Sequence, residues 1–237
     1  MTAIDRINYF SDNYIKYYKK WFHPEEFFFL VHHKNYDGIV EYLRSHGFSS
    51  FEKYNVLTFG DGHNVGNQNR FKTEFINKGY RVVYSDIDER IYHPDLRNLI
   101  LSFTEDFLIP TGMQIIQGSE EPPLDKARNV MEQRKWASVD ITWYSKVCIL
   151  NKDFKWDHGR HNKPLIFTPK ENLYLFDLGR VCKDMVLENN QKSVKIYNRV
   201  TSRYKELTID RIEKDMFAPM LSRLDPIKED LRNKNPF

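Results

Sequence analysis

Short apolar segments alternate with longer amphipathic segments along the first 90 positions of the chain. The short segments have the length of strands, and they are residues 2–7, 27–32, 54–59 and 82–84. The longer segments repeat apolar side chains at helical spacing, and they are residues 14–22, 37–46 and 67–78. Glycines follow the second and third helical segments, where helix C-caps are expected. Strands that alternate with helices in this way are typical of a doubly wound α/β sheet.

The pattern changes after residue 108. Further short strands are expected at 113–116, within 137–150 and at 173–178, and polar helical sequence follows from about residue 183. No repeat and no low-complexity tract interrupts the chain. We therefore expect one α/β domain over residues 1–190, with a mixed, mostly parallel sheet flanked by helices. A helical C-terminal appendage over residues 191–237 is expected to pack on the same domain.

Composition narrows the class of protein. The 237 residues are 41% hydrophobic, and 36 basic residues nearly balance 33 acidic ones without a long basic block, which argues against nucleic-acid binding. Two cysteines, Cys148 and Cys182, fit a reducing compartment. Charged residues interrupt the first ten positions, and no apolar stretch approaches the roughly 20 residues of a membrane span. We expect a cytoplasmic protein with at most peripheral membrane contact.

The apolar segment 82–84 leads directly to two carboxylates, Asp86 and Asp88. If the strand continued, both side chains would point the same way and Ile87 would point into the core. Two carboxylates aimed together repel each other unless a cation lies between them. The pattern therefore predicts a Mg²⁺ or Mn²⁺ site that substrate phosphates complete. The alternative is a solvated, aspartate-rich turn at the end of a strand.

Several stretches resemble the GT-A class of nucleotide-sugar glycosyltransferases, particularly the small family-2-like bacterial and viral sugar transferases. Residues 154–161 are similar to a Lys-Trp-x-x-Gly-x-His signature, and residues 173–178 to a Leu-Tyr-Leu-x-His-Leu strand. Residues 83–89 are similar to the metal motif of this family, Asp-x-Asp followed by Glu. The other matching stretches are residues 17–22 with 27–31, and residues 67–72. Together they span about residues 1 to 190.

The resemblance implies a GT-A (Rossmann-like) fold and a metal-dependent glycosyltransferase. Such an enzyme moves a sugar from a nucleotide diphosphate sugar to a glycan or lipid-linked acceptor. Asp86 and Asp88 would hold Mn²⁺ (or Mg²⁺) against the diphosphate. The family's last strand supplies a histidine as a further ligand, and Asp177 stands there in this chain. Asp177 is a competent oxygen ligand; alternatively His158 or His161 binds the metal, or Asp177 only caps the strand end.

Residues expected to bind the donor are polar and surround the predicted metal site. They are Asp5, Arg6, Asn67, Arg70, His158, His161 and Lys183. Arg70 and Asn67 lie on the helix before the aspartates, where an arginine can hydrogen-bond sugar or phosphate. Asp5 and Arg6 lie at the end of the first predicted strand, where such folds hold the nucleotide base. Each has a simpler alternative: an exposed helix residue, a turn histidine or a surface lysine.

An inverting transferase also needs a carboxylate that deprotonates the acceptor hydroxyl. Asp157, in the polar turn after Trp156, is the candidate, and Glu120 and Glu121 are its rivals. A retaining enzyme can dispense with such a base. Trp156 could stack on an acceptor sugar, or it could belong to the core. For Glu89 we expect a salt bridge or a place at a helix N-terminus.

Two other functions compete with a transferase. A haloacid dehalogenase-like phosphatase also uses a strand followed by Asp-x-Asp, but it needs Thr or Val two residues after the second aspartate, where this chain has Arg90. In such phosphatases the motif usually opens the chain, whereas three strand–helix units precede it here. A non-catalytic nucleotide-sugar-binding module on the same fold would bind a donor without turnover.

Overall fold

A computed structural model describes residues 1–54, 61–139, 144–157, 163–164, 166–188, 191, 225–227 and 229 of the chain, and only the backbone of 61–64. The chain forms two compact units, each made of two separate stretches. The first unit comprises Met1–Gly112 and Ile141–Leu175, and the second comprises Met113–Asp140 and Phe176–Phe237. The predicted appendage over residues 191–237 lies almost wholly outside the described residues, so its helical structure stays a prediction.

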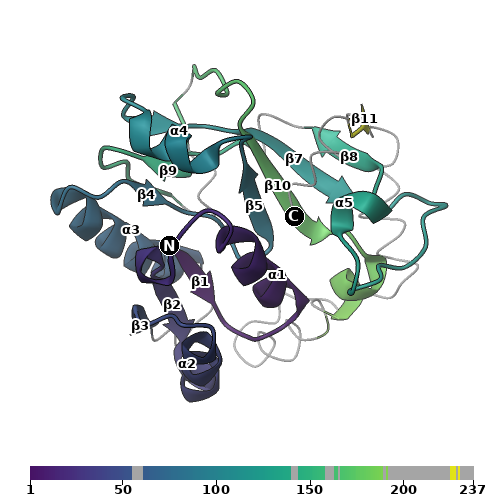
Figure 1. Cartoon of the computed structure of the whole chain (residues 1–237), viewed down its shortest axis with the longest axis horizontal. Coiled ribbons are helices and arrows are strands. Elements are labelled where there is room, and N and C mark those ends of the chain that lie inside the picture. The colour runs from purple at the N-terminus through teal and green to yellow at the C-terminus, as the bar shows by residue number, and fades with distance from the viewer. Residues whose placement is uncertain are drawn as a thin grey trace. The chain divides into compact units, whose positions relative to one another are not determined.

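A parallel sheet of three strands opens the first unit (Figure 1). Its strands are β1 (Thr2–Ile4), β2 (Phe29–His32) and β3 (Phe51–Tyr54), in the order β1-β2-β3. All four residues of the central strand β2 are buried, which accounts for the continuously apolar sequence there. The predicted strands at 2–7 and 27–32 are confirmed, and the third begins at Phe51 rather than at Tyr54.

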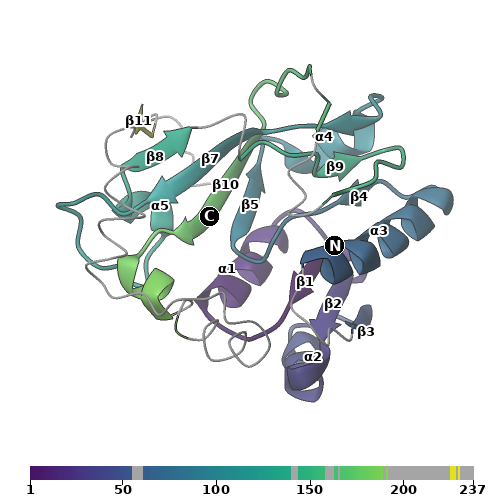
Figure 2. The same cartoon turned by 180° about the vertical axis from the view of Figure 1, so that it is seen from behind.

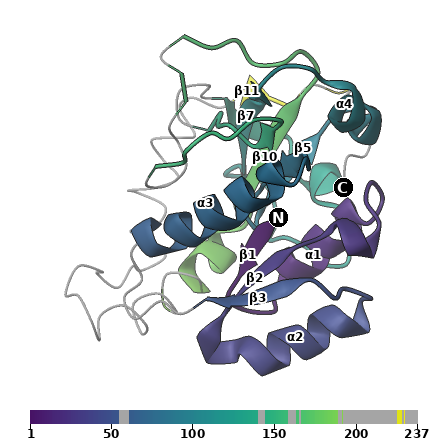
Figure 3. The ribbon, with the colours of Figure 1, turned by 90° about the vertical axis from the view of Figure 1, so that its left-hand side faces the viewer.

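Three helices surround this sheet, namely α1 (Tyr9–Tyr18), α2 (Tyr36–Ser45) and α3 (Asp61–Asn77). Figure 3 shows α2 and α3 on opposite faces of the sheet. Phe28 packs on Phe71 and Phe75 of α3, with ring centroids 4.9 and 5.0 Å away. Phe29, on the other face, contacts the ring of Phe48 behind α2 at 5.0 Å. Alternate residues of one segment thus fill two separate layers of the core.

Helix α1 begins five residues earlier than expected. Asn8 is its N-cap, because Asn8 Oδ1 accepts hydrogen bonds from the backbone N–H groups of Phe10 and Ser11 at 3.0 and 3.2 Å. Ser11 completes a capping box by accepting from the Asn8 N–H at 2.7 Å. Helix α3 also begins earlier, at Asp61. The prediction for α2 is confirmed, since Gly47 follows the helix with φ of 88°.

A second, antiparallel sheet of the first unit has the order β4-β9-β6. Its strands are β4 (Val82–Val83), β6 (Phe107–Leu108) and β9 (Ile149–Leu150). Figure 2 shows β4 and β9 side by side, 66 positions apart in sequence at the pair Val83–Ile149. The backbone nitrogen of Met1 donates to Val83 O at 2.7 Å, so the chain returns to β1 after α3. The remaining elements of this unit are η1 (Pro24–Glu26), η2 (His33–Asn35), β5 (Glu89–Tyr92) and α4 (Leu96–Ser102).

The second unit contains a sheet with the order β11-β8-β7-β10. Its elements are β7 (Thr111–Ile116), α5 (Val130–Gln133), β8 (Trp136–Val139), β10 (Tyr174–Arg180) and β11 (Asp225–Pro226). Strand β8 pairs antiparallel with both β7 and β11. The fold is therefore mixed α/β, with a parallel sheet and mixed sheets flanked by helices. The predicted mixed α/β class with flanking helices is confirmed, but the described strands are divided among separate sheets instead of forming one.

Within the described residues, no helix combines the length and the apolarity that crossing a bilayer requires.

Gly112, at the start of β7, is required by a close backbone approach. A Cβ atom there would lie 2.2 Å from the Tyr144 carbonyl carbon and 2.4 Å from Ser145 N. We therefore expect Gly112→Ala to force two backbones apart at a cost of about 2–3 kcal/mol. For a chain of this length, that should lower Tm by roughly 5–10 °C in a thermal melt. Gly38→Ala is the control, since nothing lies within 4 Å of a Cβ there; equal Tm values for the two variants would refute the prediction.

Candidate functional site

The two aspartates lie on a turn between β4 and β5 rather than on a strand. Strand β4 ends at Val83, and the Glu89 N–H donates to Asp86 O at 3.0 Å, which closes the turn. Strand alternation therefore does not govern the two carboxylates, and Ile87 is half-buried instead of pointing into the core. The expectation that both side chains point the same way because of a strand is wrong. The alternative of an aspartate-rich turn at a strand end describes the backbone correctly.

A buried lysine lies between two acids of this segment. Lys146 Nζ is 2.9 Å from Asp86 Oδ2 and 2.6 Å from Glu89 Oε1. The Lys146 side chain is 2% exposed, Glu89 is 9% exposed and Asp86 is 27% exposed. A buried ammonium needs such partners because desolvation of an uncompensated charge is costly. The expected salt bridge of Glu89 is thus confirmed, with a partner 57 positions away in sequence.

Tyr84 fixes the other oxygen of Asp86. Its hydroxyl donates to Asp86 Oδ1 at 2.7 Å and accepts a hydrogen bond from Gln68 Nε2 at 3.0 Å. Gln68 is fully buried on α3. Each carboxylate oxygen of Asp86 therefore accepts a hydrogen bond, Oδ1 from Tyr84 and Oδ2 from Lys146, and these two bonds fix the orientation of the carboxylate.

Arg90 holds the turn against α1. Its guanidinium is fully buried and donates to Ile87 O at 2.9 Å and Glu89 O at 2.7 Å. It also donates to Phe10 O at 3.0 Å and to Asn13 Oδ1 at 3.2 Å (Nε) and 3.0 Å (Nη2). One side chain thus connects backbone carbonyls on both sides of Asp88 to the first helix.

Ser85 rests on a buried pair of tyrosines from α1. Ser85 Oγ lies 3.2 Å from Tyr14 OH and 2.9 Å from Tyr18 OH. Burial raises the pKa of Tyr14 to about 12 and raises the pKa of Tyr18 well above its ordinary value. Both phenols therefore stay neutral at physiological pH. Tyr18 OH also accepts a hydrogen bond from the Ile91 N–H at 2.8 Å. Helix α1 therefore holds both ends of the turn over residues 84–88, which we call the acidic turn.

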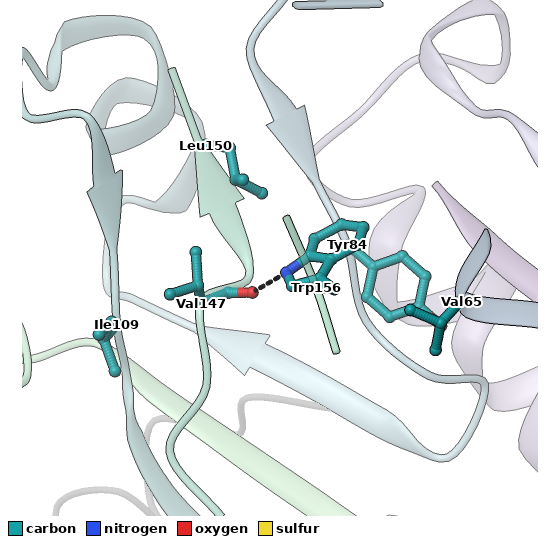
Figure 4. Close-up of a cluster of buried hydrophobic side chains, with 6 residues drawn as sticks. All are labelled: Val65, Tyr84, Ile109, Val147, Leu150 and Trp156. Atoms are coloured by element: carbon teal, nitrogen blue, oxygen red, sulfur yellow. Dashed lines mark hydrogen bonds between the residues drawn. The ribbon is translucent and has the colours of Figure 1, made fainter. Parts of the chain in front are cut away.

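Trp156 belongs to the core beneath the site. Its ring is 5.0 Å from the ring of Tyr84, and its Nε1 donates to Val147 O at 3.0 Å (Figure 4). At 1% exposure, Trp156 cannot stack on an acceptor sugar, so the core-packing alternative is correct. Asn69 of α3 binds the backbone of Trp156 on both sides, at 2.9 Å to N and 2.8 Å to O. The exposed Asp157 follows this fixed residue.

Lys72, one helical turn further along α3, supports the same segment. Its buried ammonium binds Asp153 and Phe154 O and lies 5.1 Å from the ring of Trp156. Burial lowers the pKa of Lys72, and Asp153 opposes that shift. Helix α3 therefore contacts both the acidic turn, through Gln68, and the segment that carries Asp157, through Asn69 and Lys72.

The structure places the predicted donor-binding residues of the first unit as follows. Asp5 and Arg6 follow the carboxyl end of β1 and form an ion pair of 3.4 Å. Arg70 is exposed on α3, with its guanidinium 4.3 Å from the Phe71 ring. Asn67 is half-buried on the same helix. His158 and His161 lie outside the described residues.

Two predicted residues of the second unit have defined local contacts. Asp177 lies inside β10, which continues to Arg180, so the prediction that it caps the strand end is wrong. Its carboxylate accepts from Gly179 N at 2.8 Å and from Gln114 Nε2 at 3.1 Å. The half-buried Lys183 donates its N–H to Gln117 Oε1 at 3.0 Å.

The two rivals of Asp157 as the base differ in their surroundings. The carboxylate of Glu121 accepts hydrogen bonds from the N–H groups of Gly118 and Lys135 at 2.7 and 2.8 Å, and so it connects these two backbone segments. Glu120 is exposed.

The acidic turn fits a metal ion only in part. Among the described residues, no three or more His, Cys, Asp or Glu side chains are close enough to hold one. Asp86 and Asp88 still offer two hard oxygen donors, and Mg²⁺ commonly takes one or two carboxylates with substrate phosphates and water. The donor set therefore suits an ion that arrives with a phosphorylated ligand, and the exposed part of Asp86 leaves room for it.

The site thus combines the partly exposed carboxylate of Asp86 with the buried ammonium of Lys146, which is hydrogen-bonded to it. Hydrogen bonds from the buried side chains of Tyr84 and Arg90 support the turn. It follows the carboxyl end of β4, where Val83 O accepts a hydrogen bond from the backbone nitrogen of Met1, the residue before β1. Comparison of the chain with protein-family models, with curated proteins and with solved structures found no match.

Proposed function

We propose that the protein is a metal-dependent glycosyltransferase on a GT-A fold. It would move a sugar from a nucleotide diphosphate sugar to a glycan or lipid-linked acceptor in the cytoplasm. The observation that supports this function best is the acidic turn after β4, in which Lys146 and Tyr84 hold the Asp86 carboxylate by hydrogen bonds while the Asp86 side chain stays 27% exposed. A structural ion pair alone would not require one of its members to face solvent.

Asp86 and Asp88 would hold Mn²⁺ or Mg²⁺, which when bound neutralises the charge on the departing diphosphate. Tyr84 and Lys146 keep the Asp86 carboxylate in one orientation, which reduces the reorganisation that ligand binding requires. Asp177 is proposed as a further ligand, with His158 and His161 as alternatives.

Donor binding is proposed for residues on four segments. Arg70 is exposed on α3 and can give its guanidinium donors to sugar hydroxyls or phosphate, with Asn67 three residues before it. Asp5 and Arg6 follow β1, where hydrogen bonds to a nucleotide base would form. His158, His161 and Lys183 are proposed for the diphosphate.

Asp157 is proposed as the base that accepts the proton of the acceptor hydroxyl. It is exposed, and the residue before it is fixed by Asn69 and by packing on Tyr84. A base on a fixed backbone meets the geometric requirement for general base catalysis better than one on a free loop.

The phosphatase alternative is disfavoured by the position of Arg90. That position would need a small hydroxyl or apolar side chain beside the aspartates, whereas Arg90 is buried and extends into α1. A non-catalytic nucleotide-sugar-binding module would also have the acidic turn. Only a measurement of turnover distinguishes such a module from an enzyme.

A panel of nucleotide sugars, tested by thermal shift with and without Mn²⁺, checks the proposed function. A donor at 100 times its Kd stabilises a protein by about 2.7 kcal/mol, which for this length is a rise in Tm of roughly 5–10 °C. We expect such a rise for one donor class, only with metal, together with sugar transfer or slow donor hydrolysis. Hydrolysis of sugar phosphates without any response to nucleotide sugars would favour the phosphatase. Metal-dependent binding without turnover would favour the module.

A further inference from the structure

Asp5 and Arg6 lie at the carboxyl edge of the parallel sheet in the first unit. Strand β1 ends at Ile4, and the pairing of Ile4 with Val31 places both residues beside the carboxyl end of β2. Parallel α/β sheets bind their ligands outside the carboxyl ends of the strands. Asn35, which precedes α2, donates from Nδ2 to Asp5 O at 3.2 Å. The two side chains therefore extend from a backbone that β1 and Asn35 hold in place.

The ion pair between these residues uses only part of their hydrogen-bonding capacity. The chain bends at residues 5 and 6, and Arg6 Nε lies 3.4 Å from Asp5 Oδ1. The Asp5 side chain is 34% exposed and the Arg6 side chain is 30% exposed. Within the described residues, neither Asp5 Oδ2 nor the two Nη atoms of Arg6 form a hydrogen bond. The pair therefore presents a carboxylate and, directly beside it, a planar set of donors.

A guanine base matches this pair on two adjacent edges. Its N1–H and its 2-amino group are parallel donors, which the two oxygens of a carboxylate accept together. Its O6 and N7 are acceptors, and a guanidinium donates to both of them. Uracil and thymine present a single N–H between two carbonyl oxygens, so one carboxylate oxygen would face a carbonyl oxygen. Adenine and cytosine place the lone pair of a ring nitrogen next to their amino group, and a carboxylate repels that lone pair.

We propose that Asp5 and Arg6 select guanine, so that the nucleotide which the protein recognises is a guanosine diphosphate. Asp5 accepts from N1–H and the 2-amino group, and Arg6 donates to O6 and N7. This inference rests on the proposed function, which assigns a nucleotide base to these residues and leaves its identity open. The ion pair sets the two groups side by side, as the adjacent edges of guanine require.

The preference of the wild-type protein is measured by isothermal calorimetry with Mn²⁺ and a series of diphosphates: GDP, inosine diphosphate, xanthosine diphosphate, UDP and ADP. Inosine lacks the 2-amino group, and xanthine has a carbonyl oxygen in its place. We expect GDP to bind most tightly, inosine diphosphate about tenfold more weakly, and the others more weakly again. If any of the others bound as tightly as GDP, the proposal would be overturned.

Asp5→Asn tests the contact to the 2-position of the base, because it replaces one acceptor oxygen by an amide donor. We expect GDP affinity to fall roughly 10-fold to 100-fold. Xanthosine diphosphate should then bind more tightly than GDP, because its C2 carbonyl accepts from the amide. An equal loss of both nucleotides would mean that Asp5 supports this edge without reading the base, which would refute the proposal. Asp106→Asn, at an exposed acid paired with Lys152, is the matched control and should keep the wild-type order.

Arg6→Lys distinguishes recognition of the base from simple attraction by charge. Lysine keeps the positive charge but lacks the planar set of donors that reaches O6 and N7 together. We expect GDP to bind roughly tenfold more weakly to this variant, with UDP affinity unchanged. Unchanged GDP affinity would overturn the role that we assign to Arg6.

Both side chains are partly exposed, so these variants should fold, and circular dichroism checks that they do. If Asp5→Asn does not fold, the order of GDP, inosine diphosphate and xanthosine diphosphate on the wild type still decides the question. The two levels of inference fail differently. A wild-type protein that binds neither the diphosphates nor their sugars overturns the proposed function and this inference together. A wild type that binds UDP or ADP more tightly than GDP overturns this inference alone.

Discussion

The double variant Asp86→Asn, Asp88→Asn is expected to lose metal-dependent donor binding while it keeps its fold. Replacing both carboxylates removes the two charged oxygen donors that we propose for the ion. Truncating one partner of a close charge pair typically costs about 2–5 kcal/mol, so we expect affinity to fall by at least roughly 30-fold. The measurement is a titration of Mn²⁺ and the nucleotide sugar by isothermal calorimetry.

The fold should survive this change because Lys146 keeps its shorter ion pair, at 2.6 Å, with Glu89. The asparagine at 86 can still accept the hydrogen bond from Tyr84, so neither buried donor is left alone. Asp106→Asn, which alters an exposed acid paired with Lys152, is the control. If the double variant bound a donor as tightly as this control, the assignment of the site would have to be abandoned.

The parts of the fold that the sequence predicts well depend on short-range patterns. Residues 27–32 are largely apolar because β2 is buried on both faces, and a short apolar run of this length is typical of such a strand. Helix α2 shows its buried side chains at helical spacing and ends before Gly47 with positive φ. These features depend on neighbours within a few positions, which a single sequence contains.

The features that the sequence does not predict depend on competition between local signals or on distant partners. Ser11 and Asn8 are both good N-caps, and only the capping box between them shows that Asn8 begins α1. The strand predicted at residues 82–84 ends at Val83 and does not continue through the two aspartates, because the chain turns there with a hydrogen bond from Glu89 N to Asp86 O. Strands β4 and β9 pair antiparallel, and nothing in the sequence of either strand indicates that it pairs with the other.

The candidate site divides in the same way. Asp86 and Asp88 are close together in sequence and can be recognised as a pair, whereas Lys146 and Gln68 reach the turn from positions that are distant in sequence. A weak signal exists for Lys146, since it directly precedes the fully apolar residues 147–150. A charged residue that is drawn into a core must have a partner, and here the partner is the acidic turn.

Arg90→Met is expected to destabilise the protein more than any other single change at the site. Arg90 is fully buried, and its removal leaves Ile87 O, Glu89 O and Phe10 O without the guanidinium that they now accept from. Breaking a buried charged network typically costs about 3–5 kcal/mol, which for this length lowers Tm by roughly 6–20 °C. Chemical denaturation followed by circular dichroism measures the change in the free energy of unfolding.

Two further variants distinguish the role of the guanidinium from the role of charge. Arg90→Lys keeps the charge but cannot bridge several carbonyls at once, so it should recover only part of the lost stability. Arg97→Met removes an arginine that is 35% exposed and paired with Glu26, and it should change Tm little. Because Arg90 also holds the carbonyls on both sides of Asp88, Arg90→Lys should weaken metal-dependent donor binding at temperatures where it is still folded. If Arg90→Met were as stable as the wild type, the turn would keep its shape without the hydrogen bonds of Arg90 to α1. The rigidity of the proposed site would then have to come from other contacts.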